Sequence, residues 1–186
     1  MARRDPLSAE LNDPWKRTLL DSMPHGGLVI EVGVWKGAFA AEMLQHVQPD
    51  RLVLVDQWKH FEDPLDPDKV ALPQAALDDV YRGVVDKFMD DRRVCVLRAS
   101  SLDAAVLFRS ESASWLYLDA CHQYEAVKDD LAVWWPVVVP GGFFCGHDYA
   151  PRWGVVQAVD EFVATTAGCR FVEGSFGRQF VLEKVG

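Results

Sequence analysis

Hydrophobic and polar positions along this chain are arranged in alternating blocks. Short runs that are apolar nearly throughout end at a polar residue, and longer stretches with a helical spacing of apolar residues separate them. Strands covered on both faces have such continuous apolar runs, and strands that alternate with helices are typical of βαβ units around a parallel sheet. The runs predict strands at 28–32, 51–56, 93–97, 114–119 and 141–148.

Helices are predicted between these strands, where apolar residues recur three or four positions apart. Pro136 closes one of these helices, because proline cannot continue a helix. The tail at 169–183 has two alternating segments around Gly-Ser-Phe-Gly, which predicts a terminal hairpin and an antiparallel edge to the sheet. The helical stripes fall within 39–47, 77–88, 127–134 and 155–163.

The domain organisation follows from the chain length and from the alternation of predicted strands and helices. A chain of 186 residues with 49% hydrophobic residues fits a single domain over 1–186, with a helical extension at 1–25. The segment 59–74 interrupts this alternation, because it contains several prolines and acidic residues. It is either a solvated loop or an active-site lid over the carboxyl ends of the strands. The extension, with Trp15, and this loop could cover a neighbouring subunit, so a homodimer stays open.

Composition excludes several classes of protein. The chain has 19 Lys and Arg against 28 Asp and Glu, which gives a net charge of −9. Proteins that bind nucleic acids or anionic membrane surfaces without specificity use basic patches, so we expect neither partner for this acidic chain. No run has the length and apolar character of a signal peptide or a membrane span, so we expect a cytoplasmic protein. The four cysteines form no Cys-x-x-Cys pair, which argues against a zinc knuckle or a disulfide scaffold.

The first predicted strand ends in a glycine-containing turn with the spacing Glu-x-Gly-x-x-x-Gly. Glu31 lies inside the apolar run, where an unpaired charge is costly, and Gly33 and Gly37 follow before a helix. These glycines allow a tight turn and a close approach of the backbone to a ligand at the helix N-terminus. The spacing differs from the Gly-x-Gly-x-x-Gly of dinucleotide-binding folds.

The ends of the next two strands add further polar groups. Asp56 closes the second strand, where a carboxylate can accept hydrogen bonds from both hydroxyls of a ribose. The third strand ends in Ala99-Ser100-Ser101, and Ser100 with Asp103 could equally form a helix cap. A capping turn at this position would still face the adenine side of such a pocket.

With these motifs, residues 26–186 resemble the class I S-adenosylmethionine-dependent methyltransferases. The resemblance implies a Rossmann-like α/β three-layer sandwich whose seven-stranded, mostly parallel sheet has an antiparallel C-terminal strand. It also implies S-adenosylmethionine as the cofactor. The cofactor-binding residues that it implies are Glu31, Gly33, Gly37, Asp56, Gln57, Ser100, Ser101 and Asp119.

Acidic residues and histidines gather at the ends of the last two predicted parallel strands. Asp119 ends one strand and His147-Asp148 ends the next, and adjacent parallel strands place such ends side by side. Carboxylate oxygens suit Mg²⁺, and an imidazole such as His147 also tolerates Mn²⁺ or Zn²⁺. His122 lies three residues after Asp119 and could take a proton from a hydroxyl, which makes it the candidate catalytic base.

This stretch resembles the small metal-dependent O-methyltransferases, above all the branch that acts on sugar hydroxyls. That branch has Asp-x-x-His after its fourth strand and an acidic pair after its fifth, and the run at 141–162 is similar to it. The methylmannoside 1-O-methyltransferases are one candidate type within it. By resemblance, Asp119, His147 and Asp148 would hold the metal and His122 would deprotonate the acceptor. His147 stands where many members have a carboxylate.

The predicted function is therefore metal-dependent methylation of a hydroxyl on a small carbohydrate acceptor. A catechol or other phenol is an alternative acceptor that would need an aromatic clamp. A nicotinamide-dependent oxidoreductase is an alternative from another class, because Asp56 could also hold its ribose, and a non-catalytic cofactor-binding subunit is a third. Tyr149, Arg152 and Trp153 follow the predicted metal residues and belong either to a sugar-binding loop or to an ordinary surface loop.

Overall fold

The computed structural model describes residues 14–59, 72–151, 153–174 and 176–186. Most of the expected lid at 59–74 and the first half of the extension at 1–25 lie outside these residues. Within the described ranges, no helix combines the length and the apolar character needed to cross a membrane.

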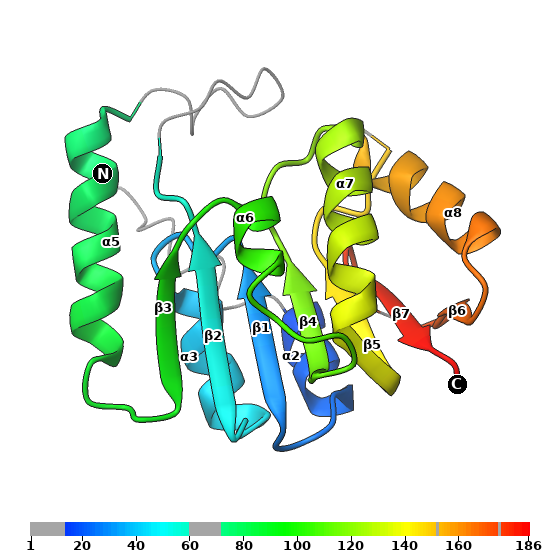
Figure 1. Ribbon diagram of the computed structural model, residues 1–186, viewed down its shortest axis with the longest axis horizontal. Coiled ribbons are helices and arrows are strands. Elements are labelled where there is room, and N and C mark those ends of the chain that lie inside the picture. Colours follow the sequence, from blue (N-terminus) through cyan, green and yellow to red (C-terminus); the bar gives the residue numbers. More distant parts are fainter. Residues whose placement is uncertain (1–13, 60–71, 152, 175) are drawn as a thin grey trace.

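A seven-stranded sheet forms the centre of the fold, in the order β3-β2-β1-β4-β5-β7-β6 (Figure 1). The first five strands along the chain pair in parallel, whereas β7 runs antiparallel to both β5 and β6. Chain order reverses direction across the sheet between β1 and β4, which is where open α/β sheets bind ligands. The strands are β1 Leu28–Val32, β2 Arg51–Asp56, β3 Val94–Arg98, β4 Ala113–Leu118, β5 Val138–Gly146, β6 Cys169–Phe171 and β7 Phe180–Lys184.

Helices cover both faces of this sheet and complete the three layers (Figure 1). Two apolar clusters, one on each face, join the helices to the strands. One face carries α2 Pro14–Ser22, α3 Ala38–His46 and α5 Gln74–Phe88. The other face carries α6 Ser101–Ala105, α7 Tyr124–Trp134, the 3₁₀ turn η1 Trp135–Val137 and α8 Val155–Thr165.

The fold class predicted from the sequence is confirmed, including the antiparallel hairpin at the C-terminal end. β1 and β2 have the predicted boundaries, and α7 ends directly before the 3₁₀ turn that contains Pro136. β5 differs, because it begins at Val138 and ends at Gly146 rather than spanning 141–148. His147 and Asp148 therefore lie just beyond the strand, at the carboxyl edge of the sheet.

Two glycines allow the close packing that brings this edge together. Gly33 has φ +91°, and a Cβ atom there would lie 2.1 Å from the carbonyl oxygen of Asp119. Gly37 has φ +64°, and a Cβ atom there would lie 2.7 Å from the ring of Phe88. Only glycine combines a left-handed backbone with no side chain, so the turn after β1 can lie directly against the end of β4.

Replacing Gly33 with alanine should therefore destabilise the fold more than the backbone conformation alone would predict. Gly141 is a matched control, because it also has a positive φ, of +77°, but a Cβ atom there would meet no described atom within 4 Å. We expect Gly141→Ala to cost about 1 kcal/mol, the typical penalty of a left-handed residue, and Gly33→Ala to cost at least about 2 kcal/mol more. Urea denaturation measures the free energy of unfolding of both variants. If Gly33→Ala and Gly141→Ala lost the same amount, the turn after β1 would have to accommodate the added methyl group without strain.

Candidate functional site

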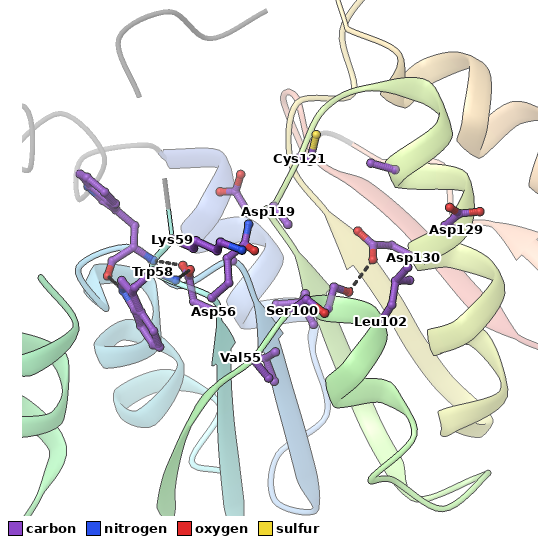
Figure 2. A pocket seen from close by; sticks show the side chains of 18 of the residues that line it. Val55, Asp56, Trp58, Lys59, Ser100, Leu102, Asp119, Cys121, Asp129 and Asp130 are labelled. Carbon is purple, nitrogen blue, oxygen red and sulfur yellow. Dashed lines mark hydrogen bonds between the residues drawn. The ribbon is translucent and has the colours of Figure 1, made fainter. Parts of the chain in front are cut away.

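A pocket of about 400 Å³ opens at the carboxyl edge of the sheet, between the ends of β1, β2, β3 and β4 (Figure 2). Its volume is in the range of cavities that bind small molecules. Most of the residues expected from the sequence to bind a cofactor line it. They are Gly33, Asp56, Gln57, Ser100, Ser101 and Asp119.

The other two expected cofactor residues lie close by but outside the pocket lining. Glu31 is buried beneath the glycine turn, and burial raises the pKa of its carboxyl well above the ordinary value. Its Oε2 atom has no hydrogen-bond partner among the described residues. Gly37 lies at the N-terminus of α3, where its carbonyl oxygen accepts a hydrogen bond from Lys87. One oxygen of Glu31 is thus a buried acceptor without a donor within the described part of the chain.

The carboxylate of Asp56 joins the two turns that form one wall of the pocket. Its Oδ2 accepts hydrogen bonds from the backbone N–H groups of Val34 and Trp35, both at 3.0 Å. Its Oδ1 accepts the backbone N–H of Trp58 at 2.8 Å. A carboxylate has about four acceptor positions, so roughly one remains for a ligand. The sequence suggested two bonds to a ribose, whereas these contacts leave room for about one.

Both tryptophans in this wall have an unusual backbone conformation. Trp35 has φ +53° and Trp58 has φ +40°, a region in which bulky residues are strained. The Nε1 atom of Trp58 donates to the carbonyl oxygen of Trp35 at 2.9 Å, and the Trp58 ring packs on Tyr81. Strained residues persist when their surroundings fix them, and the Asp56 carboxylate together with this bond does so here.

The serines after β3 have hydroxyls that already bind within the protein. Ser100 caps α6, as one reading of the sequence predicted: its Oγ accepts the N–H of Asp103 and donates to the Asp103 carboxylate. Ser101 Oγ donates to Asp130 at 2.5 Å and accepts from Trp134 Nε1 at 2.7 Å. Both serines line the pocket, but their hydroxyls have little capacity left for a ligand.

Three potential metal ligands converge beside the pocket. The donor atoms of Asp119, His122 and Asp148 all lie within 4.8 Å of one another. His122 Nε2 is 3.6 Å from Asp119 Oδ1 and 3.2 Å from Asp148 Oδ2. Adjacent ligands around an octahedral Mg²⁺ are about 3 Å apart, so the spacing suits a divalent ion. Asp119 also lines the pocket, which makes the two sites neighbours.

His147, the third metal ligand expected from the sequence, lies beside this cluster but is not one of its three members. Its Nδ1 is 3.2 Å from Asp148 Oδ2. Burial raises the pKa of Asp148, but the hydrogen bond from His147 and the nearby charges of His147 and His122 outweigh it, so the pKa lies below its ordinary value. Arg178, just before β7, adds a further cation 3.8 Å from Asp148. The metal-ligand role of His147 stays a prediction.

Two described aromatic residues of the loop after this cluster, Tyr149 and Trp153, make contacts within the protein. Trp153 is buried, and its ring lies 4.8 Å from the His122 ring. Tyr149 donates a hydrogen bond to Asp160 at 2.6 Å. Arg152 lies outside the described residues. Neither ring nitrogen of His122 makes a hydrogen bond to the described residues, so its imidazole is held by this ring contact and by the two carboxylates.

Several pocket residues were not predicted from the sequence. Trp35, Trp58 and Lys59 line the wall next to Asp56, and Asp129 and Asp130 come from α7. Asp130 could have been found, because it falls on the inward stripe of Val127, Leu131 and Trp134 at helical spacing, where a carboxylate is unusual. The wall tryptophans had no such signal, since their positions depend on backbone conformations that a pattern of residue types does not reveal.

Comparison with known proteins relates the chain to one family. Residues 30–149 match the family described as a methyltransferase domain, and this range contains most of β1, all of β2 to β5, the pocket and the three-residue cluster. No curated protein matches the sequence.

Solved structures share the fold at low sequence identity. The O-methyltransferase NovP is 17% identical with a TM-score of 0.64, over 96% of this chain and 79% of NovP. The N-methyltransferase NodS from Bradyrhizobium japonicum is 14% identical with a TM-score of 0.63, over 98% and 99% of the two chains. Fibrillarin from Aeropyrum pernix, solved with bound S-adenosyl-L-methionine, is 14% identical with a TM-score of 0.60, over 92% and 74%.

Asp130 allows a test of the pocket electrostatics through stability. Burial raises the pKa of Asp130 from 3.8 to about 6, although the hydrogen bond from Ser101 partly opposes this. In the unfolded chain this carboxyl has its ordinary pKa, so it loses its proton at a lower pH than in the folded protein. The free energy of unfolding should therefore fall as the pH rises from about 4 to about 6. We expect Asp130→Asn to match the native chain near pH 4 and to be more stable by roughly 1–3 kcal/mol above pH 7. Thermal unfolding across this pH range measures the difference, and a pH-independent difference would contradict the assignment.

Proposed function

Because this chain belongs to the methyltransferase domain family and has the class I fold of S-adenosylmethionine-dependent methyltransferases, we propose that it methylates a hydroxyl of a small acceptor with the help of a divalent ion. The observation that carries the proposal is the cluster of Asp119, His122 and Asp148 directly beside the pocket. Family membership also decides against a nicotinamide-dependent oxidoreductase. A carbohydrate is the acceptor class that we propose.

The residues in and beside the pocket fit the cofactor. Glu31 offers a buried oxygen without a donor among the described residues, which suits the ammonium group of a methionine moiety. Gly33 lets the turn lie directly against the backbone of Asp119 at the pocket, and Asp56 keeps about one acceptor position for a ribose hydroxyl. When bound, the cofactor supplies the methyl group on a positively charged sulfur. We propose that Glu31, Gly33, Gly37, Asp56, Gln57, Ser100, Ser101 and Asp119 hold it.

The cluster fits a divalent ion equally well. Asp119 and Asp148 are two carboxylates at ligand spacing, and the His122 nitrogens beside them lack hydrogen bonds to the described residues. Mg²⁺ prefers oxygen ligands, so we propose Asp119 and Asp148 as its protein ligands, and His147 contacts the same Oδ2 atom of Asp148 as His122 does. A bound ion would lower the pKa of an acceptor hydroxyl and fix its position.

We propose that His122 receives the proton of the acceptor. A neutral Nε2 can accept a proton, and the resulting imidazolium would lie between two carboxylates at 3.2 Å and 3.6 Å. The contact with Trp153 keeps the ring in this orientation and excludes solvent from it. The chain therefore contributes alignment of the two reactants and a stabilised position for the proton.

The carbohydrate acceptor rests on the resemblance of residues 141–162 to sugar O-methyltransferases. The described aromatic residues beside the cluster do not form an open clamp for a phenol, because Trp153 packs on His122 and the Tyr149 hydroxyl binds Asp160. A sugar has several adjacent hydroxyls, and two of them can bind one ion, so it matches a site with hard oxygen ligands. A phenolic acceptor is the second candidate.

The proposed function predicts methylation of sugars that stops when the ion is removed. We expect labelled S-adenosylmethionine to transfer its methyl group to sugars rather than to phenols, with loss of turnover in EDTA and recovery with Mg²⁺. Asp148→Asn should require a higher Mg²⁺ concentration, whereas Asp86→Asn, which removes a charge on α5 away from the cluster, should not. Full turnover in EDTA would show that the reaction needs no divalent ion. Transfer to phenols alone would show that the acceptor is a phenol rather than a sugar.

His122→Ala separates the role of a base from that of a metal ligand. A general base contributes typically 10²–10⁴-fold, so we expect kcat to fall by about that factor while Mg²⁺ affinity changes by less than about fivefold. Cofactor binding, measured by calorimetry, should remain. A loss of Mg²⁺ affinity equal to the loss of rate would make His122 a ligand instead, and unchanged kcat would remove it from the mechanism.

A further inference from the structure

A permanent cation lies beside the metal cluster, and the proposed function gives it no role. Asp148 has three nitrogen partners among the described residues. His122 and His147 contact its Oδ2 atom, whereas Nη1 of Arg178 lies 3.8 Å from its Oδ1 atom. Unlike an imidazole, a guanidinium keeps its charge at every pH at which the protein is folded. The Oδ1 side of Asp148 therefore has a fixed positive charge.

The backbone of Arg178 is held in place on both sides. Its carbonyl oxygen accepts the N–H of Tyr149 at 2.9 Å, and the N–H of the next residue, Gln179, donates to the carbonyl oxygen of Phe176 at 3.1 Å. Gln179 is buried, and its side-chain oxygen accepts a hydrogen bond from the Tyr117 hydroxyl at 2.6 Å. Binding groups are positioned most accurately when they extend from rigid backbone. The guanidinium of Arg178 thus extends from a fixed point next to the cluster.

The guanidinium itself is available to a ligand. Its side chain is 59% exposed, and 3.8 Å is a long distance for an ion pair. Exposed ion pairs contribute little stability, so Asp148 holds the guanidinium only weakly. The side chains of the cluster are less exposed than Arg178, which therefore lies at the rim. A ligand whose reacting hydroxyl reaches the cluster would keep its far end near this rim.

The balance of charge indicates what kind of far end this is. Asp119 and Asp148 carry two negative charges, which a divalent ion would neutralise, and the sulfonium of the cofactor would add a positive charge. Arg178 would then lack a counter-charge in this group, and like charges at such short range repel. A neutral acceptor would leave this excess of positive charge in place. An acceptor with a negative group would balance it, and the cation at the rim would attract that group to a chain whose net charge is −9.

The shape of the guanidinium selects among negative groups. Its planar N–H groups match the two oxygens of a carboxylate, which can accept two parallel hydrogen bonds. We propose that Arg178 binds a carboxylate of the acceptor, so that the substrate is an acidic sugar of the uronic acid type rather than a neutral sugar. Arg178 then determines which acceptor binds, whereas the cluster acts on the reacting hydroxyl. This proposal rests on the proposed function, because it requires both the ion and a sugar acceptor.

Pairs of sugars that differ only at C6 test the proposal. They are D-glucuronate with D-glucose, D-galacturonate with D-galactose, and D-mannuronate with D-mannose. Calorimetry in the presence of Mg²⁺ and S-adenosyl-L-homocysteine measures binding, and transfer of a labelled methyl group gives kcat and KM. For the preferred pair we expect the native chain to bind the uronate about tenfold more tightly than the neutral sugar, with a smaller difference at high salt.

Three results with the native chain would contradict this expectation. Equal affinity for the two members of every pair would overturn the proposal. Tighter binding of D-glucose 6-phosphate than of D-glucuronate would overturn the choice of a carboxylate, because it would assign a phosphate to Arg178. Methylation of phenols but of none of these sugars would contradict the sugar acceptor of the proposed function, and this proposal with it.

Two substitutions of Arg178 separate recognition from structural support. We expect Arg178→Ala to reduce the preference for the uronate to less than about twofold through a higher KM, while kcat and Mg²⁺ affinity stay within about twofold of the native values. Arg178→Lys keeps the charge but not the paired hydrogen bonds, so its preference should be intermediate.

Arg82→Ala is the matched control, because it removes an exposed arginine that pairs with Asp79 on α5. This helix lies at the β3 edge of the sheet, far from β7 (Figure 1), so the variant should keep the full preference. An Arg178→Ala variant that weakens both members of a pair by the same factor, or that loses Mg²⁺ affinity, would overturn the proposal. Either result would show that Arg178 only supports Asp148.

Discussion

The carboxylate of Asp56 is the interaction on which the shape of the pocket depends. It binds three backbone N–H groups from two separate turns, one after β1 and one after β2. Those turns contain Trp35 and Trp58, whose left-handed backbones would not persist without such support. The position of the glycine turn, and with it the wall that a cofactor would contact, therefore follows from one side chain at the end of β2.

The second constraint is the close approach of β1 and β4 at the carboxyl edge of the sheet. Gly33 lies against the backbone of Asp119, so the residue that follows β4 is fixed from the side of the cofactor pocket. The same residue belongs to the cluster with His122 and Asp148. Methyl transfer requires the methyl donor and the acceptor in a precise relative position. Asp119 directly follows a rigid strand and belongs to both the pocket and the cluster, so it fixes the position of the two sites relative to each other.

The sequence predicted the fold well because the strands are covered on both faces, so their apolar runs are continuous and their ends are marked by polar residues. β1, β2 and the Ser100 cap agree with the structure. Side-chain direction beyond a strand was harder to predict. His147 and Asp148 follow β5 as neighbours, and the histidine whose nitrogen groups with the oxygens of Asp119 and Asp148 is His122. His147 contacts Asp148 beside that group, and its role as a ligand stays a prediction. Asp130 lies on the inward stripe of α7, which the sequence shows, but its bond to Ser101 of α6 is not visible in a pattern of residue types.

Access to the cluster is uneven, and this has a kinetic consequence. The side chains of Asp119, Asp148 and His122 are 24%, 12% and 6% exposed, so the cluster opens mainly past Asp119, on the side of the pocket. Trp153 covers His122 on another side. An ion would therefore enter and leave through the same mouth as the cofactor, and a filled pocket would lengthen the time that the ion stays bound. Assembly of the site would then have a preferred order, with the ion entering first and leaving last.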